Sequence, residues 1–232
     1  MGKYDEIRYS AWKANLQLPG LGLVILTFGN VSEADHRLGI FAIKPSGVPY
    51  EELNADQMVI VDFEGKTVEG KLRPSSDTRT HALLYSRWSQ VGGIAHTHST
   101  YATAWAQALR PIPIYGTTHS DYLATDIPCT RPMEEEMIRG DYEFETGMQI
   151  LRTLEENKLD PGSTEMILVG SHAPFTWGST AEKAVYHSAV LERIAHMALL
   201  TEQIRNDAAR LQEPLIQKHW KRKHGPDSYY GQ

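Results

Sequence analysis

The stretch GGIAHTHST, Gly92 to Thr100, decides how the fold of this chain is interpreted. Two glycines and the apolar pair Ile94-Ala95 predict a buried strand, which is expected to end in two histidines one residue apart. Because alternate residues of a strand point to the same side, the rings of His96 and His98 are expected to project together. This placement favours a shared metal ion; the alternative is a polar strand end that bonds to water or backbone.

Periodicity outward from this strand predicts interspersed helices and strands. Helices are expected over residues 4–17, 75–88, 100–109, 142–157 and 180–209, and a short basic helix near the end of the chain. Strands are expected over 23–32, with a break at Gly29-Asn30, over 39–44, over 58–63 in a hairpin with 67–70, and as a pair within 165–178. Several of these strands form hairpins, so the pattern predicts one α/β domain, 1–232, with a central mostly antiparallel sheet flanked by helices.

Composition narrows the class of protein. A formal net charge of −6 and a pI of about 5.9 argue against a general nucleic-acid binder. No window reaches the roughly 18 apolar residues of a membrane span, and the N-terminal residues lack an apolar signal-peptide core. Cys129 is the single cysteine, so no internal disulfide can form. Together these features predict a cytoplasmic protein in a reducing compartment, without nucleic-acid or membrane partners.

Two further residues extend the histidine pair. His172 also follows an apolar strand, and Asp77 begins the helix that precedes the His96 strand, so a short connection could bring it near the pair. Three imidazoles leave one tetrahedral position of Zn²⁺ open, which is typical of a catalytic metal site. The remaining histidines considered are interpreted as structural or surface groups: His36 in a polar loop, and His81, His187 and His196 within helices.

Two polar turns suit a phosphate group. KPSG (44–47) and PSSD (74–77) end strands or open helices, and each offers hydroxyl groups and backbone N–H groups outside a strand ladder. The alternative is that the serines cap a helix and the proline merely turns the chain. Neither segment is a glycine-rich nucleotide loop, so ATP and NAD are not expected.

With these motifs in hand, the chain resembles the class II aldolase/epimerase family over nearly its whole length. The resemblance rests on LTFGNVS (26–32), IKPSGV (43–48), PSSDTRTH (74–81), GGIAHTHS (92–99), GTTHSDY (116–122), IPCTR (127–131), SHAPFTWG (171–178) and KHWKRKHGPDSYYGQ (218–232). The final motif, together with THSDY (118–122), points to the epimerase branch of that family.

The resemblance implies roles for individual residues. His96, His98 and His172 would bind a metal ion, with Asp77 at or beside the fourth position; Zn²⁺ suits this set, and Mn²⁺ or Co²⁺ remain possible. Related aldolases usually carry Glu where this chain has Asp77. The substrate phosphate would be held by a set of polar groups and one cation, namely Asn30, Lys44, Ser46, Gly47, Ser75 and Ser76.

The implied reaction is inversion of C4 between L-ribulose 5-phosphate and D-xylulose 5-phosphate. Retro-aldol cleavage of C3–C4 would give a dihydroxyacetone enediolate and glycolaldehyde phosphate, which would recombine after the aldehyde turns over. Asp121 and Tyr230 would transfer protons on opposite faces, and the environment must bring their pKa values toward the operating pH. The resemblance further implies a four-fold homotetramer with the site between subunits, in which Tyr230, His219 and Thr117 come from the neighbour. The pathway that uses the reaction, arabinose, ascorbate or another pentose route, stays open.

The basic run 218–224 fits a phosphosugar pocket or an intersubunit contact, and its alternative is a solvated helix face. Two other functions share the fold. One is an aldolase that releases dihydroxyacetone phosphate from L-fuculose or rhamnulose 1-phosphate. The other is a non-catalytic interaction domain like the head of adducin, but such heads lack the metal ligands that this chain carries.

Overall fold

The computed structural model describes residues 2–224 and 228, and its centre is a seven-stranded sheet in the order β4-β3-β2-β1-β5-β7-β6. Every pairing between these strands is antiparallel. The quoted stretch therefore supplies a central strand, β5, between β1 and β7. The strands are β1 Asn30–Asp35, β2 Ile40–Ile43, β3 Val59–Asp62, β4 Thr67–Glu69, β5 Gly93–His96, β6 Met166–Leu168 and β7 Pro174–Gly178.

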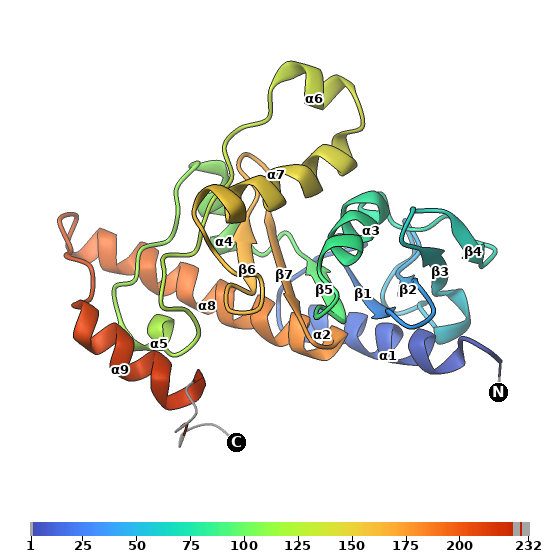
Figure 1. The fold of residues 1–232 in the computed structure, drawn as a ribbon, viewed down its shortest axis with the longest axis horizontal. Helices are drawn as coiled ribbons and strands as arrows, with labels where there is room; N and C mark the ends of the chain where they lie inside the picture. Colours follow the sequence, from blue (N-terminus) through green and yellow to red (C-terminus); the bar gives the residue numbers. More distant parts are fainter. Residues whose placement is uncertain (1, 225–227, 229–232) are drawn as a thin grey trace.

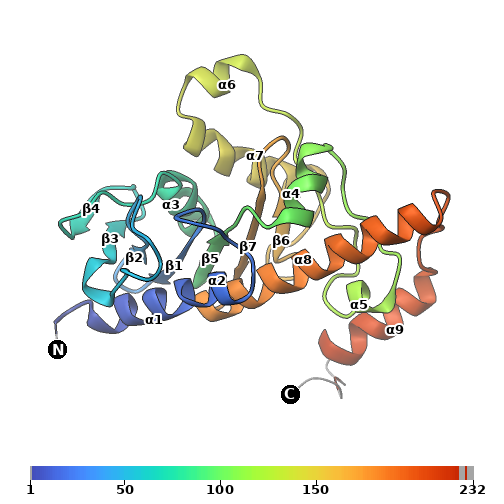
Figure 2. The same ribbon diagram turned by 180° about the vertical axis from the view of Figure 1, so that it is seen from behind.

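Helices cover both faces of the sheet (Figures 1 and 2). Helices α3 and α7 lie on one face, whereas α1, α2 and α8 lie on the other, and α5 and α9 lie together at one end of the molecule. The helices are α1 Asp5–Asn15, α2 Gln17–Gly20, α3 Thr78–Arg87, α4 Thr100–Gln107, α5 Thr117–Ser120, α6 Glu135–Arg139, α7 Tyr142–Glu156, α8 Ala181–Ile204 and α9 Glu213–His224, with a 3-10 turn at Ala55–Gln57.

The alternation of strand residues divides the core into two layers. In β2, Phe41 and Ile43 join the cluster that packs beneath α3 and α7, whereas Ile40 and Ala42 join the cluster beneath α1. In β5, Ile94 faces the first layer and Ala95 faces α8. This two-sided burial explains why short strands of small and branched apolar residues form the centre of the sheet.

The glycine that begins β5 permits a close crossing of helix α8. A Cβ atom on Gly93 would lie 2.2 Å from the backbone of Thr180 and Ala181, where α8 begins. Any side chain there would push the helix away from the strand. Glycine at the head of GGIAHTHST thus lets α8 lie directly on the strand that ends in His96.

The predicted fold class is confirmed, but several boundaries differ, and the short helices α5 and α6 were not predicted. Residues 23–29 are a loop, and the strand begins only at Asn30, so the prediction of a strand over 23–32 was wrong. Strand β5 ends at His96, which leaves His98 outside the sheet. Helix α8 ends at Ile204, five residues before the predicted 209. Among the described residues, no helix combines the length and apolar character needed to cross a bilayer.

Candidate metal and phosphate site

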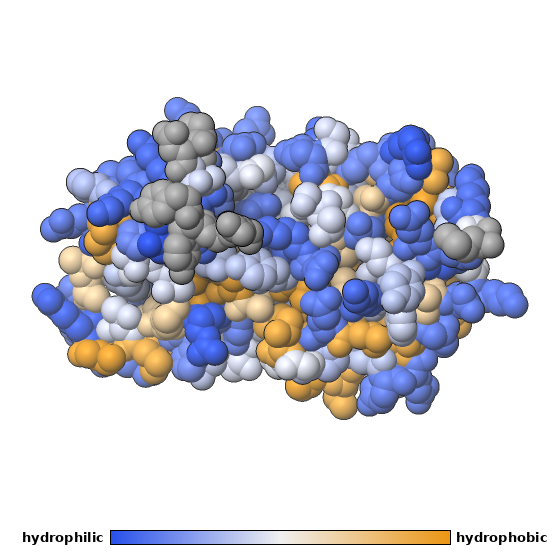
Figure 3. Space-filling model, turned by 90° about the horizontal axis from the view of Figure 1, so that it is seen from below, coloured by the Kyte–Doolittle hydropathy of each residue, from blue (hydrophilic) through white to orange (hydrophobic). Residues whose placement is uncertain are grey.

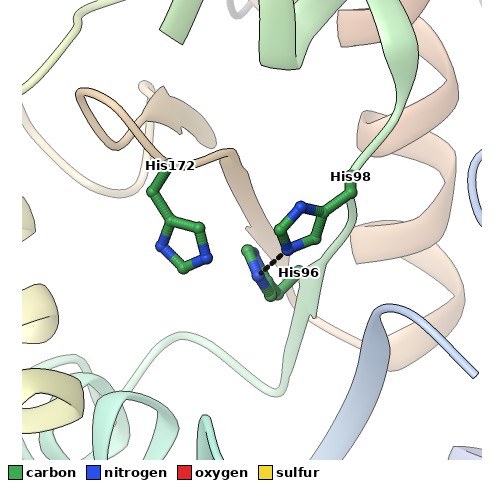
Figure 4. Close-up of side chains that lie close together, drawn as sticks. All are labelled: His96, His98 and His172. Atoms are coloured by element: carbon green, nitrogen blue, oxygen red, sulfur yellow. Dashed lines mark hydrogen bonds between the residues drawn. The ribbon is translucent and has the colours of Figure 1, made fainter. Parts of the chain in front are cut away.

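His172, from the turn between β6 and β7, meets His96 and His98 at the end of β5 (Figure 4). Candidate ligand atoms of His96, His98 and His172 all lie within 4.8 Å of one another. The Nε2 atoms of His96 and His98 are 3.2 Å apart. Two nitrogens that bind one tetrahedral Zn²⁺ at 2.0–2.1 Å are separated by about 3.3 Å, so this pair already has the spacing of metal ligands.

Contacts with neighbouring groups fix two of these rings. His96 Nδ1 donates to the carbonyl of Pro174 at 2.9 Å, and its ring stacks on Phe175. A carbonyl oxygen can only accept, so Nδ1 carries the proton and Nε2 keeps its lone pair for a metal. His172 lies on a tight turn after β6, where Ser171 adopts a left-handed φ of 60°. Its Nδ1 contacts the hydroxyl of Tyr142 at 3.4 Å, which leaves its Nε2 toward the other rings.

Desolvation in the cavity keeps the three imidazoles neutral at pH 7. It lowers the pKa of His96 and of His98, and in both cases a neighbouring histidine adds to the effect while Asp77 opposes it. The pKa of His172 is lowered to about 4, first by burial and then by His96. Neutral imidazole is the form that binds a metal ion, so the residues present fit a divalent cation without prior loss of protons.

Asp77 lies beside the histidines and turns its carboxylate into the cavity. It occupies the N-cap position of α3 but makes no side-chain cap. Instead Asn30 donates from Nδ2 to Asp77 Oδ2 at 2.6 Å and to Ser75 Oγ at 3.0 Å. Burial raises the pKa of Asp77, but His96, His81 and the amide of Asn30 outweigh it and the net pKa is lowered. An ionised Asp77 therefore gives the histidine cluster a negative neighbour.

A cavity of about 420 Å³ joins these groups to the two polar turns. Lys44 is the cation among the turn residues; its side chain is 2% exposed and its Nζ lies 4.8 Å from the ring centre of Tyr50. Burial lowers the pKa of Lys44 to about 8. The cavity is lined by all ten residues predicted for metal and phosphate, Asn30, Lys44, Ser46, Gly47, Ser75, Ser76, Asp77, His96, His98 and His172.

The loop before β1 forms another wall of this cavity. Gly29 has a φ of 74°, and a Cβ there would lie 2.8 Å from the carbonyl oxygen of His96. The hydroxyl of Tyr50 donates to the carbonyl groups of Phe28 and Gly29, which fixes the loop against the sheet. Thr27 and Phe28 of the motif LTFGNVS line the site. The sequence analysis did not identify them, because it assigned this segment to a strand.

Tyr142 and Glu143 also line the cavity, and the sequence analysis did not identify them. They begin α7, which follows its N-cap Asp141 and has the pattern of an ordinary amphipathic helix. Their acidic and aromatic character at the start of a helix was the available signal. It was not specific, because such residues are common in the first turn of any helix.

Asp121, the proton-transfer residue that the structure describes, lies outside the cavity of its own chain, as do Thr117 and His219. Asp121 ends α5, and its carboxylate accepts from His219 Nδ1 at 2.9 Å and from Arg222 at 2.7 and 3.0 Å. Thr117 lies one turn earlier in α5 and accepts from the backbone N–H of Asp121. The structure thus brings Asp121 and His219 together although they are 98 residues apart in sequence. Tyr230 lies outside the described residues.

The pKa of Asp121 moves in the opposite direction from the one expected. Burial alone would raise it, but the hydrogen bonds from Arg222 and His219 outweigh burial and lower the net pKa. Because His219 commits Nδ1 to the carboxylate, Nε2 is the nitrogen that can exchange a proton with a ligand. The pair therefore resembles an oriented histidine base more than a carboxylate base that titrates near neutral pH.

The histidines assigned to other roles mostly have structural partners. His81 bonds Ser32 Oγ at 2.7 Å and is fully buried, His187 bonds the carbonyl of Trp177, and His196 stacks on Tyr101. His36 bonds the carbonyl of Val91 from a turn. His81 differs from the interpretation in one respect: it lies close enough to Asp77 to affect its pKa, so it belongs to the surroundings of the site.

Comparison with known proteins identifies the family of the chain. The family model described as Class II Aldolase and Adducin N-terminal domain matches residues 11–199. The chain is 49% identical over 228 residues to L-ribulose-5-phosphate 4-epimerase UlaF from Salmonella paratyphi A and from Salmonella typhi, covering 98% of this chain and 99% of each relative.

Solved structures share the fold at lower identity. An L-fuculose 1-phosphate aldolase superposes with a TM-score of 0.78 at 20% identity, covering 94% of this chain and 95% of that one. The L-fuculose-1-phosphate aldolase of Thermus thermophilus has a TM-score of 0.67 at 23% identity, covering 88% of this chain and 100% of that one. At these identities the likeness establishes the architecture alone.

Proposed function

The chain belongs to the Class II Aldolase and Adducin N-terminal domain family, and from this premise we propose that it is an L-ribulose-5-phosphate 4-epimerase. It interconverts L-ribulose 5-phosphate and D-xylulose 5-phosphate by inversion at C4. The observation that carries this proposal is one cavity that is lined both by three neutral imidazoles and by a lysine and serines. A phosphorylated ketose needs both sets of groups, one for its oxygen atoms and one for its phosphate.

His96, His98 and His172 would hold the metal ion, with Asp77 beside it; Zn²⁺ is the cation we propose, and Mn²⁺ or Co²⁺ suit the same ligands. When bound, a divalent cation supplies Lewis-acid stabilisation of the negative charge that forms on the ketose oxygens as C3–C4 breaks. The rings of His96 and His172 are fixed by neighbouring groups, so the histidines would hold such a cation with little reorganisation during the reaction.

The chain itself binds and retains the fragments. Lys44, Ser46 and Ser75 line the cavity and would offer a cation and hydroxyl groups to the substrate phosphate, together with Asn30, Gly47 and Ser76. Cleavage of C3–C4 releases glycolaldehyde phosphate as a fragment that stays attached through this phosphate. Rotation of the aldehyde about the fixed phosphate presents its other face, and bond formation then inverts C4.

Proton transfer on the two faces is assigned to Tyr230 and to the Asp121–His219 pair. Asp121 orients His219, whose Nε2 would give or take the proton. Thr117, Asp121 and His219 do not line the cavity of their own chain, so in this proposal they complete the cavity of a neighbouring copy. In a closed ring of four subunits with head-to-tail contacts, every cavity would receive these three residues from the neighbouring subunit.

Exposed apolar side chains support such contacts. In the loop at the rim of the cavity, Ile25 is 67% exposed and Leu26 is 76% exposed. The end of α8, next to the α5–α9 region, exposes Met197, Leu200 and Ile204. Seen from the side of α1 and α8, hydrophobic residues form a broken band along the lower half of the surface (Figure 3). Large exposed apolar groups of this kind mark association surfaces.

The activity test is a coupled assay for D-xylulose 5-phosphate formed from L-ribulose 5-phosphate, with and without chelator. Turnover that stops on chelation supports the proposal, and no turnover with Zn²⁺ or Mn²⁺ present refutes it. Sustained release of a free aldehyde from a ketose 1-phosphate would assign the chain to the aldolase reaction instead. A chain that bound no metal and turned over neither substrate would be a non-catalytic domain of the family.

Mixed assemblies test the shared site. His96→Asn removes a metal ligand, and Asp121→Asn removes the orienting carboxylate, so each variant alone should be nearly inactive. If the two groups come from different copies, random mixing leaves about one quarter of the cavities with both intact. We therefore expect about one quarter of wild-type activity after joint unfolding and refolding in equal amounts. Activity that stays at the level of the single variants would place both groups in one chain.

A further inference from the structure

His98 is a metal-ligand candidate that lies outside the sheet, in the connection that follows β5. Strand β5 ends at His96 and helix α4 begins at Thr100, so His98 lies in a three-residue connection. Its ring nevertheless stands 3.2 Å, Nε2 to Nε2, from that of His96. The position of His98 must therefore be set by the two ends of this connection, one in β5 and the other at the start of α4.

A carboxylate from a distant helix fixes the second end. Glu192 of α8 accepts from the backbone N–H of Tyr101 through Oε1 and from that of Ala102 through Oε2, both at 2.9 Å. These N–H groups belong to the first turn of α4, where no helical partner exists. The natural capping residue, Ser99, makes no side-chain cap. Glu192 thus replaces the local cap with two hydrogen bonds from another element, and its charge complements the helix dipole.

Helix α8 is itself fixed to the strands behind the histidines. Thr176 Oγ1 of β7 donates to the carbonyl of Ala184 at 2.8 Å, and His187 Nδ1 donates to the carbonyl of Trp177 at 2.7 Å. Ala95 of β5 packs against Ala184 and Val185 in the same cluster. Glu192 follows little more than one turn later, on a helix that these contacts hold against the strand that carries His96.

The contacts beyond Glu192 keep α4 packed along α8. Trp105 Nε1 donates to the carbonyl of Ala195 at 3.0 Å, and the Tyr101 ring stacks on His196 with centroids 3.7 Å apart. Strand β5, the His98 connection, α4 and α8 therefore form a closed loop of contacts. Of these contacts between α4 and α8, the one made by Glu192 lies closest to His98 in sequence, because Tyr101 and Ala102 follow His98 by three and four residues.

We propose that Glu192 is a positioning residue for His98: its clamp on the start of α4 sets where the His98 imidazole stands relative to His96 and His172. This proposal deepens the metal site described above and rests on it. Without the clamp, α4 would begin less regularly, and the three-residue connection would sample other conformations. The metal would then gain its third nitrogen only after ordering that segment, which weakens binding.

The test compares metal affinity with stability. Isothermal titration with Zn²⁺ alone, and thermal unfolding of the metal-free protein, are measured for wild type, Glu192→Gln and Glu192→Ala. The matched control is Thr180→Ala, which removes the side-chain cap that Thr180 Oγ1 provides to Lys183 N at the start of α8. We expect lower melting temperatures in both Ala variants, but a roughly 10- to 100-fold weaker Zn²⁺ affinity only in Glu192→Ala.

The Gln variant should fall between wild type and Ala, because its amide has one acceptor oxygen in place of two. The visible spectrum of Co²⁺-loaded protein gives a second readout, since a displaced His98 changes ligand geometry, whereas general destabilisation does not. If Glu192→Ala fails to fold, Glu192→Gln carries the comparison.

The outcomes separate the two claims. Zn²⁺ affinity and a Co²⁺ spectrum unchanged in both Glu192 variants, with tight binding by wild type, would overturn the clamp and leave the metal site standing. Affinity that falls equally in Thr180→Ala would show a stability effect and overturn it as well. A wild-type protein that binds no Zn²⁺ or Co²⁺ would refute the metal site itself, and with it the role of Glu192.

Discussion

The cavity with the three histidines and the α5–α9 region differ in how they hold their charged and titratable groups. In the cavity, desolvation lowers the pKa of each histidine and leaves it neutral, and ordered partners orient the rings of His96 and His172. In the α5–α9 region, Asp121 is held as an ion by Arg222 and His219 near the surface. The first arrangement suits binding of a cation, and the second suits transfer of a proton.

The two regions also differ in completeness. All ten metal- and phosphate-site residues line one cavity within a single chain, whereas the α5–α9 residues do not reach that cavity. Binding of metal and phosphate should therefore be a property of each subunit by itself. Inversion of C4 should depend on residues that another copy supplies. Variants in each region can test whether these two properties separate.

The largest effect is expected from His96→Asn. Removal of one of three nitrogens from a preformed set should weaken Zn²⁺ binding by at least about 100-fold, more than a change in a surrounding residue would, and should abolish turnover. Isothermal titration and metal content after dialysis measure it. His36→Asn is the matched control, since His36 also bonds a backbone carbonyl, that of Val91, but lies outside the cavity. Equal loss of affinity in both variants would contradict the proposed ligand set.

Asp121→Asn should separate the two regions most clearly. The variant keeps the cavity intact, so Zn²⁺ affinity should stay within about twofold of wild type. Turnover should fall by about 10²- to 10⁴-fold, the usual contribution of an acid–base group. Asp126→Asn serves as control, because Asp126 pairs with Arg210 in the same part of the fold and has no proposed role. A large loss of Zn²⁺ affinity in Asp121→Asn would contradict the view that metal binding in the cavity is independent of the α5–α9 region.

Much of this arrangement could be predicted from sequence because local patterns encode it. The longer helices and most strands follow hydrophobic periodicity, whereas the short helices α5 and α6 were not predicted. The residues of KPSG, and Ser75, Ser76 and Asp77 of PSSD, reach the cavity as expected. The rings of His96 and His98 lie close together as predicted, but for a partly different reason, and their role as metal ligands stays a prediction. His98 follows the strand instead of extending it, so strand alternation does not place its ring. Its position depends on a three-residue connection and a helix start, which periodicity does not describe.

The rest depends on contacts between distant segments. The stretch LVILTF has the composition of a strand, but residues 23–29 form a loop, with Leu26 and Gly29 at positive φ and Tyr50 bonded to its carbonyls. No local rule pairs Asp121 with α9, because 98 residues separate it from His219. The family resemblance named both residues. Only the fold shows that they meet each other while remaining apart from the histidines of their own chain.

Lys44→Gln should have a smaller effect, confined to substrate binding. Loss of a buried cation next to the phosphate-binding hydroxyls should raise KM by about tenfold or more, with Zn²⁺ affinity unchanged. Because the pKa of Lys44 is about 8, wild-type protein should lose this charge as pH rises through 8, so its KM should climb above that pH. The Gln variant should lack this climb. A pH profile of KM that is parallel in the two proteins would remove Lys44 from phosphate binding.

A further difference between the two regions concerns the stability of metal-free protein in acid. The pKa of His172 is about 4 in the folded protein and near 6.5 in the unfolded chain. Between pH 4 and pH 6.5 the unfolded chain therefore binds a proton at this residue, whereas the folded protein does not. Stability should therefore fall as pH drops from 6.5 to 4, by up to about 1.4 kcal/mol per pH unit from this group. Asp121 acts in another window: its folded pKa lies below 3.8, so its contribution is lost only under more acidic conditions.

Glu33 and Glu165 work against the histidine, since burial raises their pKa to about 7 and the fold then holds protons that the unfolded chain releases. Their contribution is the same in a His172→Gln variant, so it cancels in the difference from wild type. Denaturant unfolding at pH 4.5, 5.5 and 6.5 should show a shallower pH slope in His172→Gln and an unchanged slope in Asp121→Asn. Identical slopes in all three proteins would mean that His172 is not held neutral by burial, and the contrast between the two regions would lose its electrostatic basis.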